Sequence, residues 1–361
     1  DALTDGNDNV AIGYQALTTD TQGDNSVAIG VNALFSQNGT NGSVYNVAVG
    51  KSAGFAITTG LQNTLIGGLA GDALTDADNN IAIGYGALSA DTLGSTSIGI
   101  GVLALAEQNF TTATDVYNVA IGFRAGEKVT TGIENTIIGA LTGDALTEGG
   151  LNVAVGASAL GVDTKGSRNV AVGVSALNQQ NFTTATTSYN TGVGYQAGGA
   201  VTTGIQNTLI GALAGDALTD ADFNVAVGIA ALSADTLGSR STAIGDNALA
   251  AQNFTTATNT YNTAVGFNAG LAVTTGVQNT LVGGLAGGAI TTGQNNVSLG
   301  AFSLDAEVAG NKSIAIGTYA LSGQSSATST DVYNTAVGHS AGQSVTTGTL
   351  NTLIGGLAGD A

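Results

Sequence analysis

A short block centred on a glycine recurs at a nearly constant spacing through the whole chain of 361 residues. The block reads N-x-A-I/V-G-x-x-A-L, and its central glycines follow a 17-residue period, as from Gly13 to Gly30. The step from the second to the third block of each four is longer, as from Gly30 to Gly50. The central glycines are Gly13, Gly30, Gly50, Gly67, Gly84, Gly101, Gly122, Gly139, Gly156, Gly173, Gly194, Gly211, Gly228, Gly245, Gly266, Gly283, Gly300, Gly317, Gly338 and Gly355. Four blocks form a superrepeat, and the five superrepeats are 1–71, 72–143, 144–215, 216–287 and 288–361. A fixed period is the signature of a repeat architecture, so we interpret residues 1–361 as one repetitive segment.

Each block carries the pattern of one short strand. Val, Ile or Thr stands three residues before the central glycine, and Ile or Val stands one before it, with Leu299 as the exception. Two β-branched positions in alternation, closed by glycine, favour a strand that ends in a tight bend. Blocks of equal length stack like over like at the strand spacing of about 4.8 Å. The sequence therefore predicts an all-β fold, a parallel β-solenoid or β-roll of about 20 coils.

An asparagine four residues before the central glycine recurs in sixteen of the twenty blocks, and serine takes the place in the others. Stacked coils would place these amides above one another, so we predict a hydrogen-bonded ladder along the axis. The ladder positions singled out are Asn9, Asn46, Asn63, Asn80, Asn118 and Asn135.

The side chains on the two faces of each strand differ in size, but both faces are uncharged. We take Val10, Ile12 and Leu17 as the large core residues of the first coil. The opposite face carries Asn, Ala and Gly without charge, and a face of small residues favours close approach of another backbone. We therefore expect copies of the chain to lie side by side.

The fourth block of each superrepeat has its large apolar side chain at a different position from the first two blocks. Two residues before its central glycine it carries a large residue such as Leu65, where other blocks carry Ala, Gly or Ser. Four residues after the central glycine, Leu17 and Leu34 of the first two blocks give way to Gly54 and Gly71. We expect the core volume to be held constant while the cross-section alternates.

Composition excludes several classes of function. The chain has 7 basic and 25 acidic residues, a net charge of -18, which argues against nucleic-acid binding. It has no Cys and a single His, so disulfides and thiolate metal sites are excluded. The sequence has no run of about 18 apolar residues, so it predicts no insertion into a membrane. We found no nucleophile with a His partner and no phosphate-binding loop, and we expect no enzyme activity and no cofactor.

Blocks such as S-V-A-I-G at 26–30, N-V-A-I-G at 9–13 and 118–122, and N-T-A-V-G at 262–266 and 334–338 resemble a known family. They are similar to the head repeats of YadA-type trimeric autotransporter adhesins and to the N-T-A-I-G-Y-x-A-L arrays of phage tail-fibre and related marine bacterial surface proteins. The resemblance implies a trimeric, left-handed parallel β-roll fibre exposed on a cell or a virion and used in attachment.

One longer loop per superrepeat is a candidate contact region, because loops on rigid scaffolds carry function. It reads Q-N-F-T-T-A-T at 108–114, 180–186 and 252–258, and it is also a place for glycans on Asn and Thr. A tyrosine follows it at 45, 117, 189, 261 and 333, either as a packing residue or as an aromatic platform for sugars. The candidate contact residues are Phe110, Phe182, Phe254, Tyr117, Tyr189 and Tyr261.

Other candidate sites have simple structural readings. Asp76 with Asp78, and Asp220 with Asp222, form acidic turns that are weak Ca²⁺ candidates. The alternative is that these carboxylates keep exposed edges soluble. His339 follows a central glycine where other superrepeats have Lys, Phe or Tyr, so we expect an outward, partly packed side chain.

These patterns favour the structural shaft of an extracellular, cell-surface or virion fibre, a side-by-side homotrimer that holds something at a distance from that surface. A surface glycan or receptor is the candidate partner. The alternative is a head-to-tail filament, because Asp360 and Ala361 repeat the phase of Asp1 and Ala2. We also expect the segment to belong to a longer array. A third hypothesis is an ice-binding solenoid, suggested by Thr58-Thr59, Thr130-Thr131 and Thr202-Thr203, although these pairs recur only once in four coils.

Overall fold

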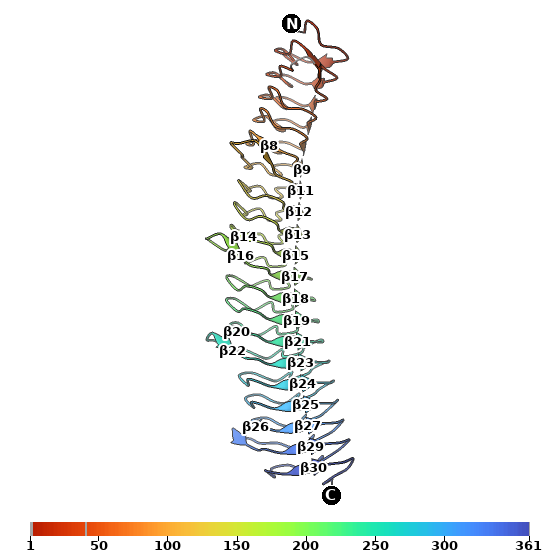
Figure 1. Cartoon of the computed structure of the whole chain (residues 1–361), viewed down its shortest axis with the longest axis vertical. Helices are drawn as coiled ribbons and strands as arrows, with labels where there is room; N and C mark the ends of the chain where they lie inside the picture. The colour runs from red at the N-terminus through yellow and green to blue at the C-terminus, as the bar shows by residue number, and fades with distance from the viewer. Residues whose placement is uncertain (1–2, 40–41, 361) are drawn as a thin grey trace. The chain divides into compact units, whose positions relative to one another are not determined.

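The computed structural model describes residues 3–39 and 42–360 as two compact units, Asp1–Ser188 and Tyr189–Ala361 (Figure 1). Asp1, Ala2 and Ala361, on which the matching phase of the two ends depends, lie outside the described residues. The division falls within the third superrepeat, at its longer loop, and both units are built from the same coil.

Each unit contains one main strand per coil. In Asp1–Ser188 the main strands are β1 (Val10–Ile12), β3 (Val27–Ile29), β5 (Val47–Val49), β6 (Thr64–Ile66), β7 (Ile81–Ile83), β9 (Ile98–Ile100), β11 (Val119–Ile121), β12 (Thr136–Ile138), β13 (Val153–Val155) and β15 (Val170–Val172). In Tyr189–Ala361 they are β17 (Thr191–Val193), β18 (Thr208–Ile210), β19 (Val225–Val227), β21 (Thr242–Ile244), β23 (Thr263–Val265), β24 (Thr280–Val282), β25 (Val297–Leu299), β27 (Ile314–Ile316), β29 (Thr335–Val337) and β30 (Thr352–Ile354).

Short strand pairs flank the longer loop of each superrepeat. They are β2 (Gly23–Asp24) with β4 (Gly42–Ser43), β8 (Gly94–Ser95) with β10 (Thr114–Asp115), β14 (Gly166–Ser167) with β16 (Thr186–Thr187), β20 (Gly238–Ser239) with β22 (Thr258–Asn259), and β26 (Gly310–Asn311) with β28 (Thr330–Asp331). Figure 1 shows several of these pairs on the side of the coil away from the main strands.

The main strands of each unit pair in parallel, each with the strand of the next coil. Val119 of β11 pairs with Thr136 of β12, which pairs in turn with Val153 of β13, so equivalent positions of successive blocks stack on one another. The same register holds in the second unit, where β18 pairs with β19. Residues 3–39 and 42–360 contain no helix. The predicted all-β parallel solenoid is confirmed, with ten main strands among the described residues of each unit.

The strand face that enters the core is the opposite of the one predicted. Ala28 of β3 is 0% exposed, whereas Val27 and Ile29 on either side are partly exposed. In the first coil Leu17 is buried as expected, but Val10 and Ile12 are 43% and 58% exposed. The alanine face therefore lines the inside of the coil and is not available to another chain. Because each coil is short and narrow, the inward strand position accommodates alanine while leucine fills the far corner.

The predicted exchange of bulk in the fourth block is confirmed. Leu65 is fully buried at the inward strand position, and a Cβ added to Gly54 or Gly71 would lie 2.8 Å from a Leu65 methyl carbon. Those glycines stand where the first two blocks of each superrepeat have a buried leucine. The interior keeps its volume because one large side chain replaces another from a different position.

The central glycines stack directly on one another. Their φ angles lie between +126° and +143°, a region that L side chains rarely adopt. A Cβ on Gly228 would lie 2.5 Å from both the carbonyl carbon and the oxygen of Gly245. Only glycine permits this close approach of successive coils. This explains why glycine recurs at the centre of every block.

Candidate functional site

The asparagine column forms a buried ladder, and most of its bonds run to the backbone. Asn63 donates its backbone N–H to Asn46 Oδ1 at 2.9 Å, and Asn80 does the same to Asn63 Oδ1 at 3.0 Å. The Asn63 Nδ2 donates to the Ala77 carbonyl at 2.8 Å. Asn46, Asn80, Asn118 and Asn135 are likewise buried, while Asn9 in the first coil is half-buried. Each amide thus joins two coils, as the predicted ladder requires, with only some direct contacts between amides.

A buried acidic residue anchors each longer loop, and the sequence reading missed it. Asp91 is 0% exposed; its Oδ1 accepts from the backbone N–H of Gly94 and of Phe110, both at 3.0 Å. Its Oδ2 accepts from Gln108 Nε2 at 2.6 Å, and Gln108 Oε1 accepts from Asn118 Nδ2 at 2.9 Å. The loop is therefore tied to the asparagine ladder. The equivalent acids are Asp20, Asp163, Asp235 and Glu307.

Only half of the predicted loop contact residues are exposed. Phe110, Phe182 and Phe254 are 8%, 6% and 7% exposed, so the expectation that their rings face a partner is wrong. The backbone N–H of each of these phenylalanines also donates to the acid of the preceding coil.

The tyrosines at the base of the loop remain exposed. Tyr117, Tyr189 and Tyr261 are exposed by 56%, 51% and 54% and have φ between +52° and +56°. In the fifth superrepeat, Tyr333 accepts a hydrogen bond from Lys312 Nζ at 3.0 Å. Lys312 also donates to Asp331, which holds the pKa of that carboxyl below its usual range. The tyrosine column keeps its candidate contact role as a prediction.

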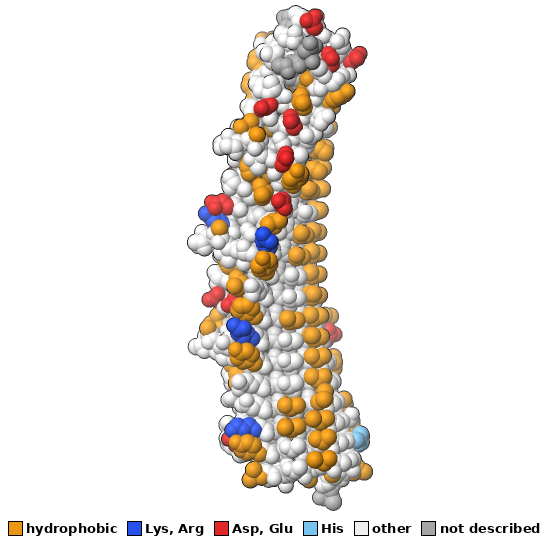
Figure 2. Space-filling view, in the orientation of Figure 1, with side chains coloured by type: hydrophobic (Ala, Val, Ile, Leu, Met, Phe, Trp, Pro, Cys, Tyr) orange, Lys and Arg blue, Asp and Glu red, His pale blue; other side chains and the backbone are white. Residues whose placement is uncertain are grey.

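An extended uncharged surface is the outward face of the main strands, which we call the outer sheet face. It consists of the side chains three residues and one residue before each central glycine, and it contains only Val, Ile, Thr and Leu. Ile121, Ile210 and Leu299 are 37%, 38% and 45% exposed on it. In each unit, Figure 2 shows hydrophobic side chains gathered in columns over the main strands.

A neighbouring column widens this face. The residue after the central glycine is an exposed aromatic or aliphatic side chain in several coils, such as Tyr85 at 57%, Ile229 at 56% and Phe267 at 58%. His339 lies in this column as expected, exposed and edge-on to Tyr319 with ring centroids 6.3 Å apart. A sheet face in contact with water normally alternates with polar side chains, so this surface is typical of one that is covered.

The acidic turns bind the preceding coil. Asp76 accepts from Thr59 Oγ1 at 2.5 Å, and Asp78 accepts from the Leu61 N–H at 2.6 Å. Asp220 and Asp222 repeat this arrangement with Thr203 and Ile205, at 2.6 and 2.8 Å. Across the ranges 3–39 and 42–360, no three His, Cys or acidic side chains cluster as a metal site. Binding of Ca²⁺ by these carboxylates stays a prediction. The observed hydrogen bonds give the carboxylates a structural role, because they link neighbouring coils.

A second column of acidic residues is partly buried, and hydrogen bonds do not fully offset the burial of its carboxyl groups. Asp72, Asp144 and Asp216 occupy one position in successive superrepeats, and burial raises the pKa of each carboxyl above its ordinary value. The Oδ1 atoms of Asp72 and Asp216 are buried and have no hydrogen-bond partner. These groups cost stability when they are charged.

Threonine hydroxyls also serve the stacking of coils. Thr75 Oγ1 donates to the Thr92 carbonyl at 3.0 Å, and Thr147 Oγ1 donates to the Thr164 carbonyl at 3.0 Å. In the pairs that suggested ice binding, Thr58 donates to the Thr75 carbonyl and Thr59 to Asp76. These bonds favour a structural role for the threonines over a lattice of free hydroxyls.

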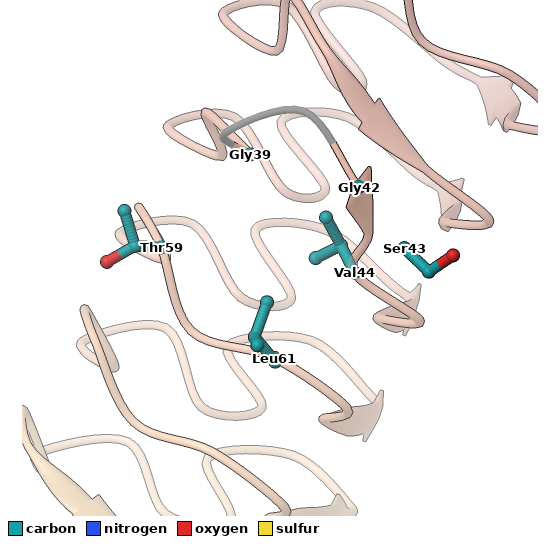
Figure 3. Close-up of a pocket in the computed structure, with 6 residues that line it drawn as sticks. All are labelled: Gly39, Gly42, Ser43, Val44, Thr59 and Leu61. Carbon is teal, nitrogen blue, oxygen red and sulfur yellow. The ribbon is translucent and has the colours of Figure 1, made fainter.

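A cavity of about 280 Å³ lies beneath the first longer loop. Figure 3 shows its lining residues, Gly39, Gly42, Ser43 and Val44 from the loop and Thr59 and Leu61 from the coil that follows. None of these side chains ionises. Two residues of the loop, Thr40 and Asn41, are outside the described residues, so we assign no site to this cavity.

Comparison of the chain with models of protein families, with curated proteins and with solved structures gives no match. In the part of the chain that the structure describes, no helix is long and apolar enough to span a bilayer.

Proposed function

We propose that the chain is the structural shaft of an extracellular or virion-attached fibre, in which three copies lie side by side with their outer sheet faces toward a common axis. The observation that carries the proposal is the outer sheet face, whose two columns are aliphatic or threonine at every coil. The number three comes from the resemblance to trimeric adhesin and tail-fibre repeats.

The distribution of charge supports contact through this face. Each chain has a net charge of -18, so copies repel one another wherever their acidic residues meet. The two columns of the outer sheet face contain none of the 25 acidic residues, which stand on the turns, on the loops and inside the coil. Two or three chains can therefore bury these columns without placing like charges together, and burial of aliphatic surface favours association at about 25 cal/mol per Å².

The register-locked coil within each unit supports a spacing role. Within each unit, asparagines join successive coils, central glycines stack on one another, and the hydrogen-bond pattern recurs from one superrepeat to the next. In a translationally repeated surface, a contact site such as the tyrosine column would be presented many times, which suits weak attachment by avidity. The head-to-tail filament and the ice-binding solenoid remain alternatives without a specific observation in their favour.

Sedimentation equilibrium tests the association and the face together. A lysine at the outer sheet face, Ile138→Lys, would place a charge between the copies. We expect the native chain to sediment at three times its mass of 35.1 kDa and the variant to dissociate. The matched control is Thr112→Lys on the exposed loop, which should keep the native mass. A native chain that sediments at 35.1 kDa at micromolar concentration would overturn the proposal.

A further inference from the structure

One tripeptide occurs at the same place in three of the five longer loops. Asn109-Phe110-Thr111, Asn181-Phe182-Thr183 and Asn253-Phe254-Thr255 each have the form Asn-x-Thr without proline. This form is the acceptor for N-linked glycosylation. The first superrepeat has Asn38-Gly39-Thr40 in the same place, but Thr40 lies outside the described residues, so the argument depends on the other three.

The side-chain amide of each loop asparagine is held by its oxygen and presents its nitrogen. Thr92 Oγ1 donates to Asn109 Oδ1 at 3.3 Å. Thr164 and Thr236 make the same bond to Asn181 and Asn253, also at 3.3 Å. Among the described residues, no hydrogen bond is recorded for Nδ2 of these three asparagines. Asn109 and Asn253 are exposed and Asn181 is half-buried.

The phenylalanine and threonine of each tripeptide leave the asparagine Nδ2 facing outward. The phenylalanine in the middle is buried, and its backbone N–H is held by Asp91, Asp163 or Asp235. The threonines at the third position, Thr111, Thr183 and Thr255, are exposed. The loop therefore fixes its backbone inward while the asparagine amide and the threonine hydroxyl face solvent.

Two tripeptides of the related acceptor form Asn-x-Ser provide an internal contrast. Asn296-Val297-Ser298 lies in the asparagine ladder, where Asn296 is 0% exposed and its Nδ2 donates to the Gly310 carbonyl at 2.9 Å. Asn311-Lys312-Ser313 lies at β26, and Asn311 is 9% exposed with its Nδ2 bonded to Ser329. A sugar on either nitrogen would break these bonds, so the folded coil excludes it.

The geometry points to Asn109, Asn181 and Asn253 as N-linked glycosylation sites. The donor is a sugar activated by a diphosphate group, carried on a nucleotide or a lipid. The Asn Nδ2 forms a bond to the anomeric carbon, the bond from that carbon to the diphosphate oxygen breaks, the diphosphate leaves with the electron pair, and the amide loses one proton to the transferase.

In each unit, the modified loops would lie away from the outer sheet face. The longer loops lie beside the short strand pairs, which Figure 1 shows on the side of the coil away from the main strands. A sugar at each loop therefore leaves the outer sheet face free. The inference does not depend on the proposed association, because the mass of the assembly and the occupancy of the loops are measured separately.

Glycopeptide mass spectrometry of the protein purified from its natural source tests this inference. The folded protein is digested and its peptides are fragmented by electron transfer, which keeps the sugar on its residue. We expect sugar on Asn109, Asn181 and Asn253, and none on Asn296 or Asn311. Unmodified loop asparagines in this material, or occupied Asn296 or Asn311, would overturn the assignment.

A pair of variants, secreted from a cell line that performs N-glycosylation, tests the role of the third residue. Thr255→Ala should cause loss of the sugar from Asn253, with Asn109 and Asn181 still occupied as controls within the same molecule. The conservative Thr255→Ser should retain the sugar on Asn253. Retention of the sugar in Thr255→Ala, or its loss in Thr255→Ser, would contradict recognition of the tripeptide.

Discussion

The central glycines are the residues that tolerate least change, because each carries a positive φ and lies against the carbonyl of the next coil. Gly283 and its neighbour Gly284 provide a direct comparison. A Cβ on Gly283 would lie 2.6 Å from the Gly300 carbonyl carbon, whereas a Cβ on Gly284 would meet nothing within 4 Å.

We predict that Gly283→Ala lowers the free energy of unfolding by roughly 2–4 kcal/mol, from backbone strain and overpacking together. Gly284→Ala should change it by less than about 0.5 kcal/mol. Chemical denaturation of both variants measures the difference. Equal effects of the two substitutions would contradict the stacking of glycines described above.

The partly buried carboxyl of Asp216 makes stability depend on pH. Its pKa is raised above the ordinary value of 3.8, mainly by burial, and the hydrogen bond to its own backbone only partly offsets this. Between the two pKa values the folded state binds more protons than the unfolded state, so the free energy of unfolding falls as pH rises through the folded pKa.

Asp216→Asn removes the charge and keeps the shape. We predict a gain on the order of 0.5 kcal/mol at pH 7, reduced by solvent screening, and no gain below about pH 3.8, where the carboxyl is protonated in both states. Thermal unfolding across this pH range measures the effect, with the exposed Glu134→Gln as the control. A gain that grows as pH falls would show that the sign is wrong.

At the residue scale, the sequence predicted the glycines and the asparagine ladder but missed the buried acids. The regular columns were predictable because one chemistry repeats at every coil. Asp91 and Gln108 stand in the column that Ile57 and Leu74 occupy in other coils, seven residues after the central glycine. An acidic residue in the first block and a glutamine in the second, at a position that is aliphatic in the third and fourth blocks, were the available signal. Its partners in the loop could not be known without the fold.

At the scale of the coil, the fourth block of a superrepeat fills the interior with a different combination from the first two blocks. Leu209 with Gly215 represents one, since a Cβ on Gly215 would lie 2.7 Å from Leu209 Cδ2. Ala226 with Leu232 represents the other, and both are fully buried. The backbone suits the exchange, because φ is +54° at Gly215 and +56° at Leu232.

A double-mutant cycle tests this exchange. Leu209→Ala alone should cost about 2–5 kcal/mol by leaving a cavity. Gly215→Leu alone should also destabilise, because its side chain would clash with Leu209. Together the two substitutions should recover much of the loss, measured as a strong coupling in denaturant unfolding. If the losses of unfolding free energy in the two single variants simply add in the double variant, the two side chains do not compensate for each other in volume.

The direction of the strand faces was not predictable from alternation alone. Period two separates Val and Ile from Asn and Ala, but both sets are uncharged, and either could face inward. The width of the coil decides, and this width depends on turns whose path the pattern does not give. The wrong assignment placed the contact between chains on the alanine face, which the structure shows to be the interior.

At the scale of the whole molecule, different surfaces of the coil have different roles. The outer sheet face carries aliphatic side chains and no charge, the longer loops carry asparagines with outward nitrogens, and the acidic turns join coils and keep the remaining surface charged. Copies of a chain with a net charge of -18 repel one another least where they meet through surface that carries no acidic residues.

Spin-label distances between chains test most directly which face the copies share. The chain has no cysteine, so a single cysteine at Thr280 on the outer sheet face, or at Thr256 on a longer loop, carries a unique nitroxide label. Both side chains are exposed in the single chain, and retained assembly mass is the control. We predict dipolar coupling between chains at Thr280, with a distance shorter than at Thr256. Coupling that is absent at Thr280, or a shorter distance at Thr256, would contradict association through the outer sheet face.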